Sequence, residues 1–218
     1  MSSKKKGPGA TRALVDNRLL VHHPLDFSFK AIQEFSDLLR ERPRLRSKQL
    51  QGVFDLEDEL SAGSSRGSVE VEKFPSTALK VNNNLLVSWD RFMPSISRLF
   101  QDPMLKLGWI DFSFNDLKTI DKCLLELPNL TTIYLHGNNI VTLAQVDKLS
   151  QLDNLKSLTL HGNPIEINSG YRFYVLSRVP QLQTLDFSGI TKSDRASCET
   201  WKTMIVPKTK SRRKRDDD

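Results

Sequence analysis

The side chains best suited to chemistry in this sequence are two histidines. His136 lies in the segment YLHGNN and His161 in the segment TLHGNP, so both occupy the same place in two copies of one motif. A pair of imidazoles could share a metal ion, but a protein zinc site needs at least a third protein ligand. No other histidine or cysteine falls at that level of the motif, and Asp111 is displaced from it. No metal site is therefore predicted.

Enzymatic chemistry is not predicted either. The sequence holds no glycine-rich phosphate loop, no recognisable set of serine, histidine and aspartate, and no pair of carboxylates placed in a pocket. We therefore predict a non-enzymatic protein without a cofactor and without a small-molecule substrate.

Both histidines belong to a repeated pattern. Stretches that begin at Leu107, Leu130, Leu155 and Leu182 read LGWIDFSFNDL, LTTIYLHGNNI, LKSLTLHGNPI and LQTLDFSGI. They follow the form L-x-x-L-x-L-x-x-N-x-L, except that the last lacks the asparagine, and one further copy, TALKVNNNLL, lies upstream. Repeats of about 20 to 29 residues with this form are leucine-rich repeats. The predicted fold is an α/β leucine-rich-repeat solenoid of about five short repeats, with a parallel concave sheet and helical N-terminal and C-terminal caps.

Each repeat should contribute one short strand, in which two apolar residues point inward and the residue between them points outward. The asparagine falls where the chain leaves the strand. Its amide group can donate to and accept from backbone groups that neither a helix nor a sheet reaches. We predict such a structural ladder for Asn84, Asn115, Asn138 and Asn163.

The outward positions of the strands form the candidate binding surface. Neighbouring strands lie about 4.8 Å apart, so equivalent residues of successive repeats line up. On the concave side this alignment gathers Trp109, Asp111, Tyr134, His136 and His161. Aromatic residues with adjacent charge are a common composition of protein-binding hot spots. We predict that these five residues bind a partner, and the alternative of ordinary solvent-facing residues stays open.

The segments around the repeats differ in composition. The predicted divisions are a disordered basic N-terminus at 1–23, a capping helix at 24–40, a flexible insertion at 41–75, the repeats at 76–190, a cap helix at 191–206 and a disordered basic and acidic tail at 207–218. The first capping helix is predicted from the helical spacing of Phe29, Ile32, Phe35 and Leu39. The insertion is either an unselected linker or a short partner-docking segment around residues 53–60.

The positive charge is concentrated at the two ends of the chain. The formal net charge is +6, and segments 1–15 and 207–218 carry it, so the repeats lack the charge of a nucleic-acid-binding domain. The tail KTKSRRKRDDD is compatible with a nuclear-import signal, a nucleic-acid contact or a contact with an acidic surface such as a microtubule. The two cysteines have no metal-type spacing, which favours a reducing, cytoplasmic compartment. Neither a membrane span nor a secretory signal is predicted.

The C-terminal part carries a more specific pattern. Residues 163–186 follow the form N-P-x…Y-R-x-x-V-L…L-P-x-L-x-x-L-D, with Val179 in place of the leucine before the second proline. This pattern resembles the C-terminal cap of a group that includes a regulator of protein phosphatase one, the spliceosomal A-prime protein and an axonemal outer-arm dynein light chain. Phosphatase regulation would need a longer array than the one predicted here.

Blocks throughout residues 24–206 are similar to the leucine-rich repeat-containing protein 51 family. They read PLDFSF, VNNNLL, WIDFSFNDL, YLHGNNI, SLTLHGNP and LDFSGITKSDR, and we place the first of them outside the repeats. The resemblance implies a cytoplasmic, non-enzymatic scaffold of the cilium or axoneme. Its partners would be other proteins of a large assembly, with contact between the basic tails and tubulin. The alternative is a nuclear adaptor that resembles the spliceosomal A-prime protein.

Overall fold

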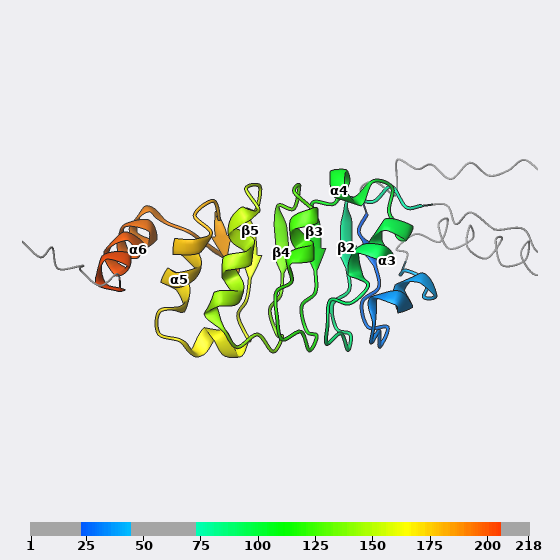
Figure 1. Cartoon of the computed structure of the whole chain (residues 1–218), viewed down its shortest axis with the longest axis horizontal. Coiled ribbons are helices and arrows are strands. Elements are labelled where there is room, and N and C mark those ends of the chain that lie inside the picture. The colour runs from blue at the N-terminus through cyan, green and yellow to red at the C-terminus, as the bar shows by residue number, and fades with distance from the viewer. Residues whose placement is uncertain (1–22, 45–72, 206–218) are drawn as a thin grey trace, which may run out of the picture.

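The computed structural model of the chain describes residues 23–44 and 73–205. Within these ranges, short strands follow one another along the long axis of the molecule (Figure 1). They form one sheet in sequence order, namely β1 (Leu25–Asp26), β2 (Ala78–Lys80), β3 (Trp109–Asp111), β4 (Thr132–Tyr134), β5 (Ser157–Thr159), β6 (Thr184–Leu185) and β7 (Ser188–Gly189). Neighbours from β1 to β6 are parallel, and β7 is antiparallel to β6. The predicted α/β solenoid with a parallel sheet is confirmed.

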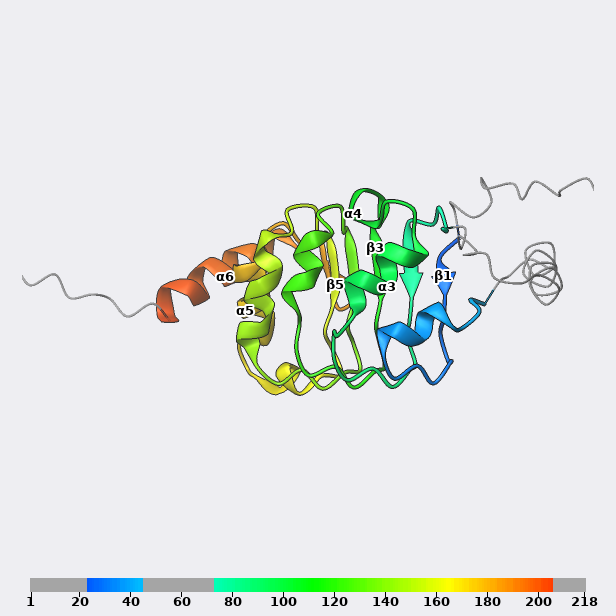
Figure 2. The ribbon, with the colours of Figure 1, turned by 45° about the vertical axis from the view of Figure 1, so that its right-hand side comes forward.

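Short helices and turns connect each strand to the next. The helices are η1 (Phe35–Leu39), α3 (Phe92–Leu99), α4 (Pro103–Lys106), η2 (Lys122–Glu126), η3 (Leu143–Gln151), η4 (Pro164–Ile167), α5 (Tyr171–Arg178) and α6 (Lys192–Ile205). Figure 2 shows α3 and α5 on one side of the strands. We call the opposite face of the sheet the concave face. The η elements are 3-10 helices, which rise about 2.0 Å per residue. A few residues in this conformation are therefore enough to lead the chain from one strand back to the start of the next.

The register of the strands builds the core. Equivalent apolar residues lie side by side across the sheet, and all are buried: Leu25, Leu79, Ile110, Ile133, Leu158 and Leu185. Burial of one such side chain stabilises the fold by about 1.5–3 kcal/mol. The residues between the core positions are left on the concave face.

The N-terminal region differs from the predicted capping helix at 24–40. The block PLDFSF forms a further repeat strand, β1, and Leu25 pairs with Leu79 of β2. Only Phe35–Leu39 are helical, as η1. The array therefore begins one repeat earlier than the sequence pattern indicated, and PLDFSF lies within the repeats rather than outside them.

The backbone shows why a continuous helix does not form there. Phe29 and Ala31 have φ angles of 56° and 53°, which lie in the left-handed region and interrupt a right-handed helix. The amide of Phe27 donates to the carbonyl of Lys80 at 2.8 Å, so this backbone is satisfied by the sheet. Phe29 contributed to the helical spacing, but its side chain is 61% exposed. The spacing was therefore misleading at that position.

The element η1 packs against α3 and the end of β3 through aromatic rings. The ring of Phe35 lies 4.9 Å from that of Phe92, 5.7 Å from that of Phe112 and 6.0 Å from that of Trp89, measured between centroids. All four side chains are buried. This contact joins the first described segment, 23–44, to the repeats that follow it.

The last parallel strand, β6, has only two residues. It ends at Leu185, and Asp186 and Phe187 have φ angles of 52° and 59°. Positive φ at both central residues is the conformation of a tight type I′ hairpin turn, and β7 follows directly. The predicted closing helix at 191–206 corresponds to α6, which is joined to α5 by an ion pair between Arg172 and Asp194 at 3.2 Å.

Three predicted segments lie outside the described residues. They are the basic N-terminus apart from its last residue, most of the 41–75 insertion with its 53–60 segment, and the 207–218 tail. Among the residues that are described, every helix is too short or too polar to cross a membrane.

Candidate functional site

Buried asparagines connect each repeat to the preceding one. The Nδ2 of Asn138 donates to the carbonyls of Leu135 and Phe112, at 2.9 Å each. Its Oδ1 accepts from the amide of Leu117 at 3.0 Å. Equivalent bonds, shifted along the array, are made by Asn84, Asn115 and Asn163. These side chains are used within the fold, so they do not form part of a binding surface.

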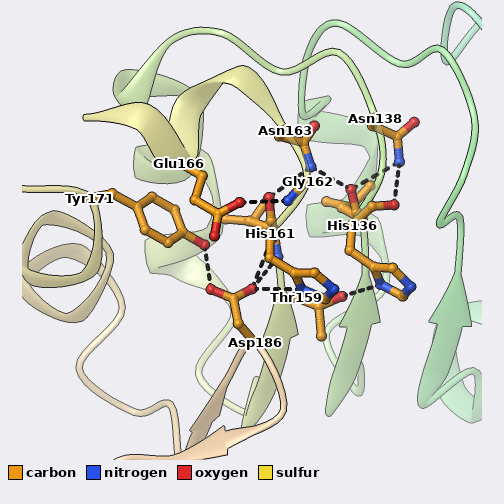
Figure 3. Close-up of polar contacts among 11 residues, drawn as sticks. His136, Asn138, Thr159, His161, Gly162, Asn163, Glu166, Tyr171 and Asp186 are labelled. Carbon is orange, nitrogen blue, oxygen red and sulfur yellow. Dashed lines mark hydrogen bonds and ion pairs between the residues drawn. The ribbon is translucent and has the colours of Figure 1, made fainter. Parts of the chain in front are cut away.

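The two histidines lie together on the concave face. Their rings stack with centroids 4.7 Å apart and planes 7° apart. The Nδ1 of His136 is 2.8 Å from the hydroxyl oxygen of Thr159, and the Nδ1 of His161 is 3.3 Å from Oδ1 of Asp186. Figure 3 shows both contacts. Each imidazole is therefore oriented by a polar neighbour of its own.

Asp186 closes the C-terminal end of this surface. The strand that would pair with the residues after Leu158 turns away, so its backbone carbonyls cannot accept hydrogen bonds from them. The carboxylate of Asp186 accepts these hydrogen bonds instead. Oδ1 accepts from the amides of Leu160 and His161 at 2.7 and 2.9 Å, and Oδ2 accepts from the Tyr171 hydroxyl at 2.7 Å. In Figure 3 the carboxylate lies between Tyr171 and His161. The sequence pattern did not identify this role of Asp186.

The other three predicted residues lie beside the histidines. The rings of Trp109 and Tyr134 meet edge to face at 5.8 Å, and those of Tyr134 and His136 meet at 6.1 Å. Asp111 is in register with Tyr134 on the neighbouring strand and is only 7% exposed. The structure thus brings all five predicted residues onto one continuous surface.

Two phenylalanines that the sequence reasoning missed complete this surface. Phe187 is 59% exposed and lies across Tyr134, His136 and His161, with ring centroids 5.4 to 5.6 Å away. Phe114 is 52% exposed and meets His136 at 5.1 Å. We call the six rings, each of which contacts at least one other, the aromatic cluster, which consists of Trp109, Phe114, Tyr134, His136, His161 and Phe187.

Phe114 occupies a position that disfavours large side chains. The equivalent residues of successive repeats all have positive φ: Phe29 at 56°, Asn83 at 55°, Phe114 at 52°, Gly137 at 65° and Gly162 at 69°. Glycine and asparagine suit this conformation, whereas another residue loses about 1–2 kcal/mol there. A Cβ atom at position 137 would lie 2.7 Å from the ring of Phe114. The glycine therefore leaves room for that ring.

Replacement of Phe114 by asparagine is expected to leave the free energy of unfolding unchanged or to raise it by up to about 1 kcal/mol. Relief of the backbone strain offsets the loss of a half-exposed ring. Urea unfolding of both proteins measures the difference. The reverse exchange at the equivalent position, Asn83→Phe, is the control and should destabilise by about 1–2 kcal/mol. A loss of roughly 3 kcal/mol for Phe114→Asn, as for a buried phenylalanine, would contradict this account.

Protonation of His136 is disfavoured in the folded chain. Burial lowers the pKa of His136 below its ordinary value of 6.5, and proximity to His161 lowers this pKa further. The carboxylates of Asp111 and Asp186 act in the opposite direction. The unfolded chain therefore binds more protons at this residue than the folded chain between the folded pKa and 6.5. Across that window the free energy of unfolding rises with pH.

Acidification is accordingly expected to destabilise the chain through His136. The contribution is complete above pH 6.5 and is lost as the pH falls to the folded pKa. Urea unfolding over roughly pH 5 to 8, where histidines titrate, measures it for the native chain and for His136→Gln. The native chain should lose more stability than the variant as the pH falls. Parallel curves for the two proteins would show that His136 does not carry this dependence.

The described residues offer no set for covalent or metal chemistry. Within 23–44 and 73–205, no three histidine, cysteine, aspartate or glutamate side chains lie close enough together to hold a metal ion. Burial raises the pKa of both cysteine thiols, Cys123 and Cys198. A thiol with a raised pKa is a poor nucleophile at neutral pH.

Comparison with known proteins agrees with the fold. Residues 90–210 match the family model described as a leucine-rich repeat. The protein is thus of the leucine-rich-repeat class, whose members are generally non-enzymatic modules that bind other proteins. Leucine-rich repeat-containing protein 51 of Rattus norvegicus is 45% identical over 193 residues, which cover 88% of this chain and 92% of the relative. The chain belongs to the leucine-rich repeat-containing protein 51 family, which confirms the resemblance seen in the sequence.

A more local likeness involves a spliceosomal protein. U2 small nuclear ribonucleoprotein A' of Aspergillus fumigatus is 37% identical over 73 residues, which cover 34% of this chain and 29% of the relative. Among solved structures, the crystal structure of the Drosophila melanogaster SNF/U2A' complex is similar with a TM-score of 0.47 and 27% identity. That match covers 56% of this chain and 66% of the other.

Proposed function

We propose that this chain is a structural or adaptor component of the cilium or axoneme that docks a partner protein on its concave face. The observation that carries the docking part is the aromatic cluster. Its six rings join four strands, and two of them, Phe114 and Phe187, are more than half exposed. Exposed aromatic rings in mutual contact are the usual composition of a protein-binding hot spot.

The backbone supports the same conclusion. Phe114 and Phe187 are both held at positive φ, at 52° and 59°. Bulky residues in this conformation reduce stability, and such strain concentrates at functional positions. Neither ring is needed to fill the core, because both point away from it. A contact outside the chain accounts for both the exposure and the strain.

The ciliary part of the proposal rests on membership of the family, which the resemblance links to ciliated organisms. The terminal segments 1–15 and 207–218 bring positive charge that suits contact with tubulin, whose surface is acidic. Such contact would weaken as salt is added, because exposed charges are screened over about 8–10 Å at physiological ionic strength. Docking on the concave face would be less sensitive to salt.

The test is retention in axonemes. The full-length chain, tagged and expressed at its native level in a ciliated cell, should remain with axonemes after detergent extraction. The double variant Tyr134→Ala with Phe187→Ala should be retained several-fold less. Leu105→Ala is the matched control, since Leu105 is an exposed apolar residue of α4 outside the aromatic cluster. Absence of the native chain from extracted axonemes would overturn the proposal.

A second candidate is a nuclear adaptor, and the local likeness to U2 small nuclear ribonucleoprotein A' favours it. The basic tail KTKSRRKRDDD would then act as an import signal, and the concave face would hold an RNA-binding protein. Imaging of the same tagged cells separates the two candidates. Nuclear accumulation supports the adaptor, whereas exclusively cytoplasmic or ciliary signal removes it.

A further inference from the structure

The concave face holds one carboxylate, that of Asp111 on β3, which has no ion-pair partner among the described residues. Asp111 is 7% exposed, and its Oδ1 accepts from the amide and the hydroxyl of Ser113 at 3.0 and 2.6 Å. Its Oδ2 has no hydrogen-bond partner in the part of the chain that the structure describes, and no cation there is within ion-pair distance. Among the described residues, Asn82 Oδ1 is the only fully buried side-chain oxygen or nitrogen without a partner, so Oδ2 of Asp111 is open to the concave face although the residue is largely buried.

The nearest cation along the sheet is already engaged. Lys80 is in register with Asp111 on the neighbouring strand, but its Nζ pairs with Oδ2 of Asp26 at 3.5 Å. Among the residues in register, this part of the outward row holds two carboxylates, Asp26 and Asp111, and one ammonium group, that of Lys80. Within the described residues, this row therefore complements a partner that brings positive charge.

Aromatic rings lie on either side of the unpaired carboxylate. Trp109 precedes it by two residues on the same face of β3, and Tyr134 is in register with it on β4. The two rings meet edge to face, with planes 82° apart. Aromatic faces beside a carboxylate suit a guanidinium group, which stacks on rings and is more weakly hydrated than an ammonium group.

We infer that Trp109, Asp111 and Tyr134 receive an arginine side chain of the docked partner. This inference rests on the proposed docking and adds the chemistry of the partner. The arginine would donate to Oδ2 of Asp111 and lie against the two rings. From Tyr134 the aromatic cluster leads to the exposed ring of Phe187, so the residue next to the arginine is apolar. A segment rich in aspartate or glutamate is excluded by the same charge.

The test uses the full-length chain labelled with nitrogen-15 and a short capped peptide that places one arginine between leucines. The indole signal of Trp109 should shift as the peptide is added. The indole signals of Trp89 and Trp201 serve as internal references, and the Trp89 indole already donates to the Thr119 carbonyl at 2.7 Å. The same peptide with citrulline, a neutral analogue of arginine, should bind about tenfold more weakly, and one with glutamate should not bind.

The variant Asp111→Asn keeps an acceptor for Ser113 but removes the charge. It should reduce the preference for arginine over citrulline to about one. Asp153→Asn is the matched control, because it changes the net charge equally at an exposed site outside the concave face and should preserve the preference. If Asp111→Asn does not fold, Tyr134→Leu provides the second variant and should weaken binding of the arginine peptide about tenfold.

Equal binding of the arginine and citrulline peptides, or equal effects of Asp111→Asn and Asp153→Asn, would overturn the inference. So would the absence of any shift at Trp109. These failures differ from failure of the proposed function. Axonemal retention that depends on Tyr134 and Phe187 without a preference for arginine removes only the inference. Preference for arginine in a chain absent from axonemes removes only the ciliary proposal.

Discussion

Replacement of Asn138 by alanine is expected to lower the free energy of unfolding by about 3–5 kcal/mol. Three backbone groups depend on this side chain, namely the carbonyls of Leu135 and Phe112 and the amide of Leu117. All three residues are fully buried, so water cannot replace the amide group. Each buried polar group left unpaired costs about 1–3 kcal/mol, and the individual costs do not add fully.

Urea unfolding followed by circular dichroism measures this loss. The neighbouring variant Asn139→Ala is the matched control, because Asn139 is exposed and its side chain donates to the exposed carboxylate of Asp116, at 3.0 Å, while its backbone amide bond to Leu117 is kept in the variant. It should change the free energy of unfolding by less than about 0.5 kcal/mol. Equal effects at the two positions would mean that Asn138 does not hold adjoining repeats together.

The repeats could be predicted from sequence because their pattern is local. Each short strand needs two inward residues and one outward residue, and this requirement recurs with every copy. The predicted binding residues followed from the same alignment, which places Asp111, Tyr134 and His136 on neighbouring strands. Their contacts with one another require no information beyond the strand spacing.

The first repeat was missed because it lacks the residue that marks the others. Register places Lys30 where the next repeat has Asn84. The asparagine of the second repeat bonds to it as the later asparagines bond to their preceding repeats, since Oδ1 of Asn84 accepts from the amide of Ile32 at 3.0 Å, and it also accepts from the amide of Lys30 at 2.9 Å. A single-sequence pattern cannot show that one repeat is stabilised by the asparagine of the next.

Phe187 was missed for a different reason. The pattern L-x-L assigns it to the core, as it assigns Phe112 in an earlier repeat. No further parallel strand follows β6, so the chain reverses at Asp186 and the ring of Phe187 turns outward. Phe114 did leave a trace in the sequence, because glycine or asparagine stands at its position in three other repeats. A phenylalanine in such a column indicates a residue kept for contact rather than for stability.

Replacement of Asp186 by alanine is expected to lower the free energy of unfolding by about 3–5 kcal/mol. The amides of Leu160 and His161 and the hydroxyl of Tyr171 would lose their acceptor. Hydrogen bonds to a charged group contribute about 1.5–3 kcal/mol each, again without full additivity. Alanine would also be strained at the φ of 52° that this turn requires.

The matched variant is Asp186→Asn. Asparagine tolerates the left-handed conformation and retains an oxygen that can accept from Leu160 and His161, so the loss should stay below about 1 kcal/mol. Urea unfolding compares the two variants with the native chain. Similar losses for alanine and asparagine would contradict the proposed closing role of the carboxylate.

The same pair of variants links stability to the binding surface. Asp186 and Phe187 form one turn, and the ring of Phe187 rests on Tyr134, His136 and His161. Without the bonds of the carboxylate, the turn loses the anchor that keeps this ring in place. We therefore expect Asp186→Ala, at a temperature where it is still folded, to be retained in extracted axonemes less than Asp186→Asn. Equal retention of the two folded variants would show that the bonds of Asp186, which close the array, are not needed to hold the aromatic cluster in its binding arrangement.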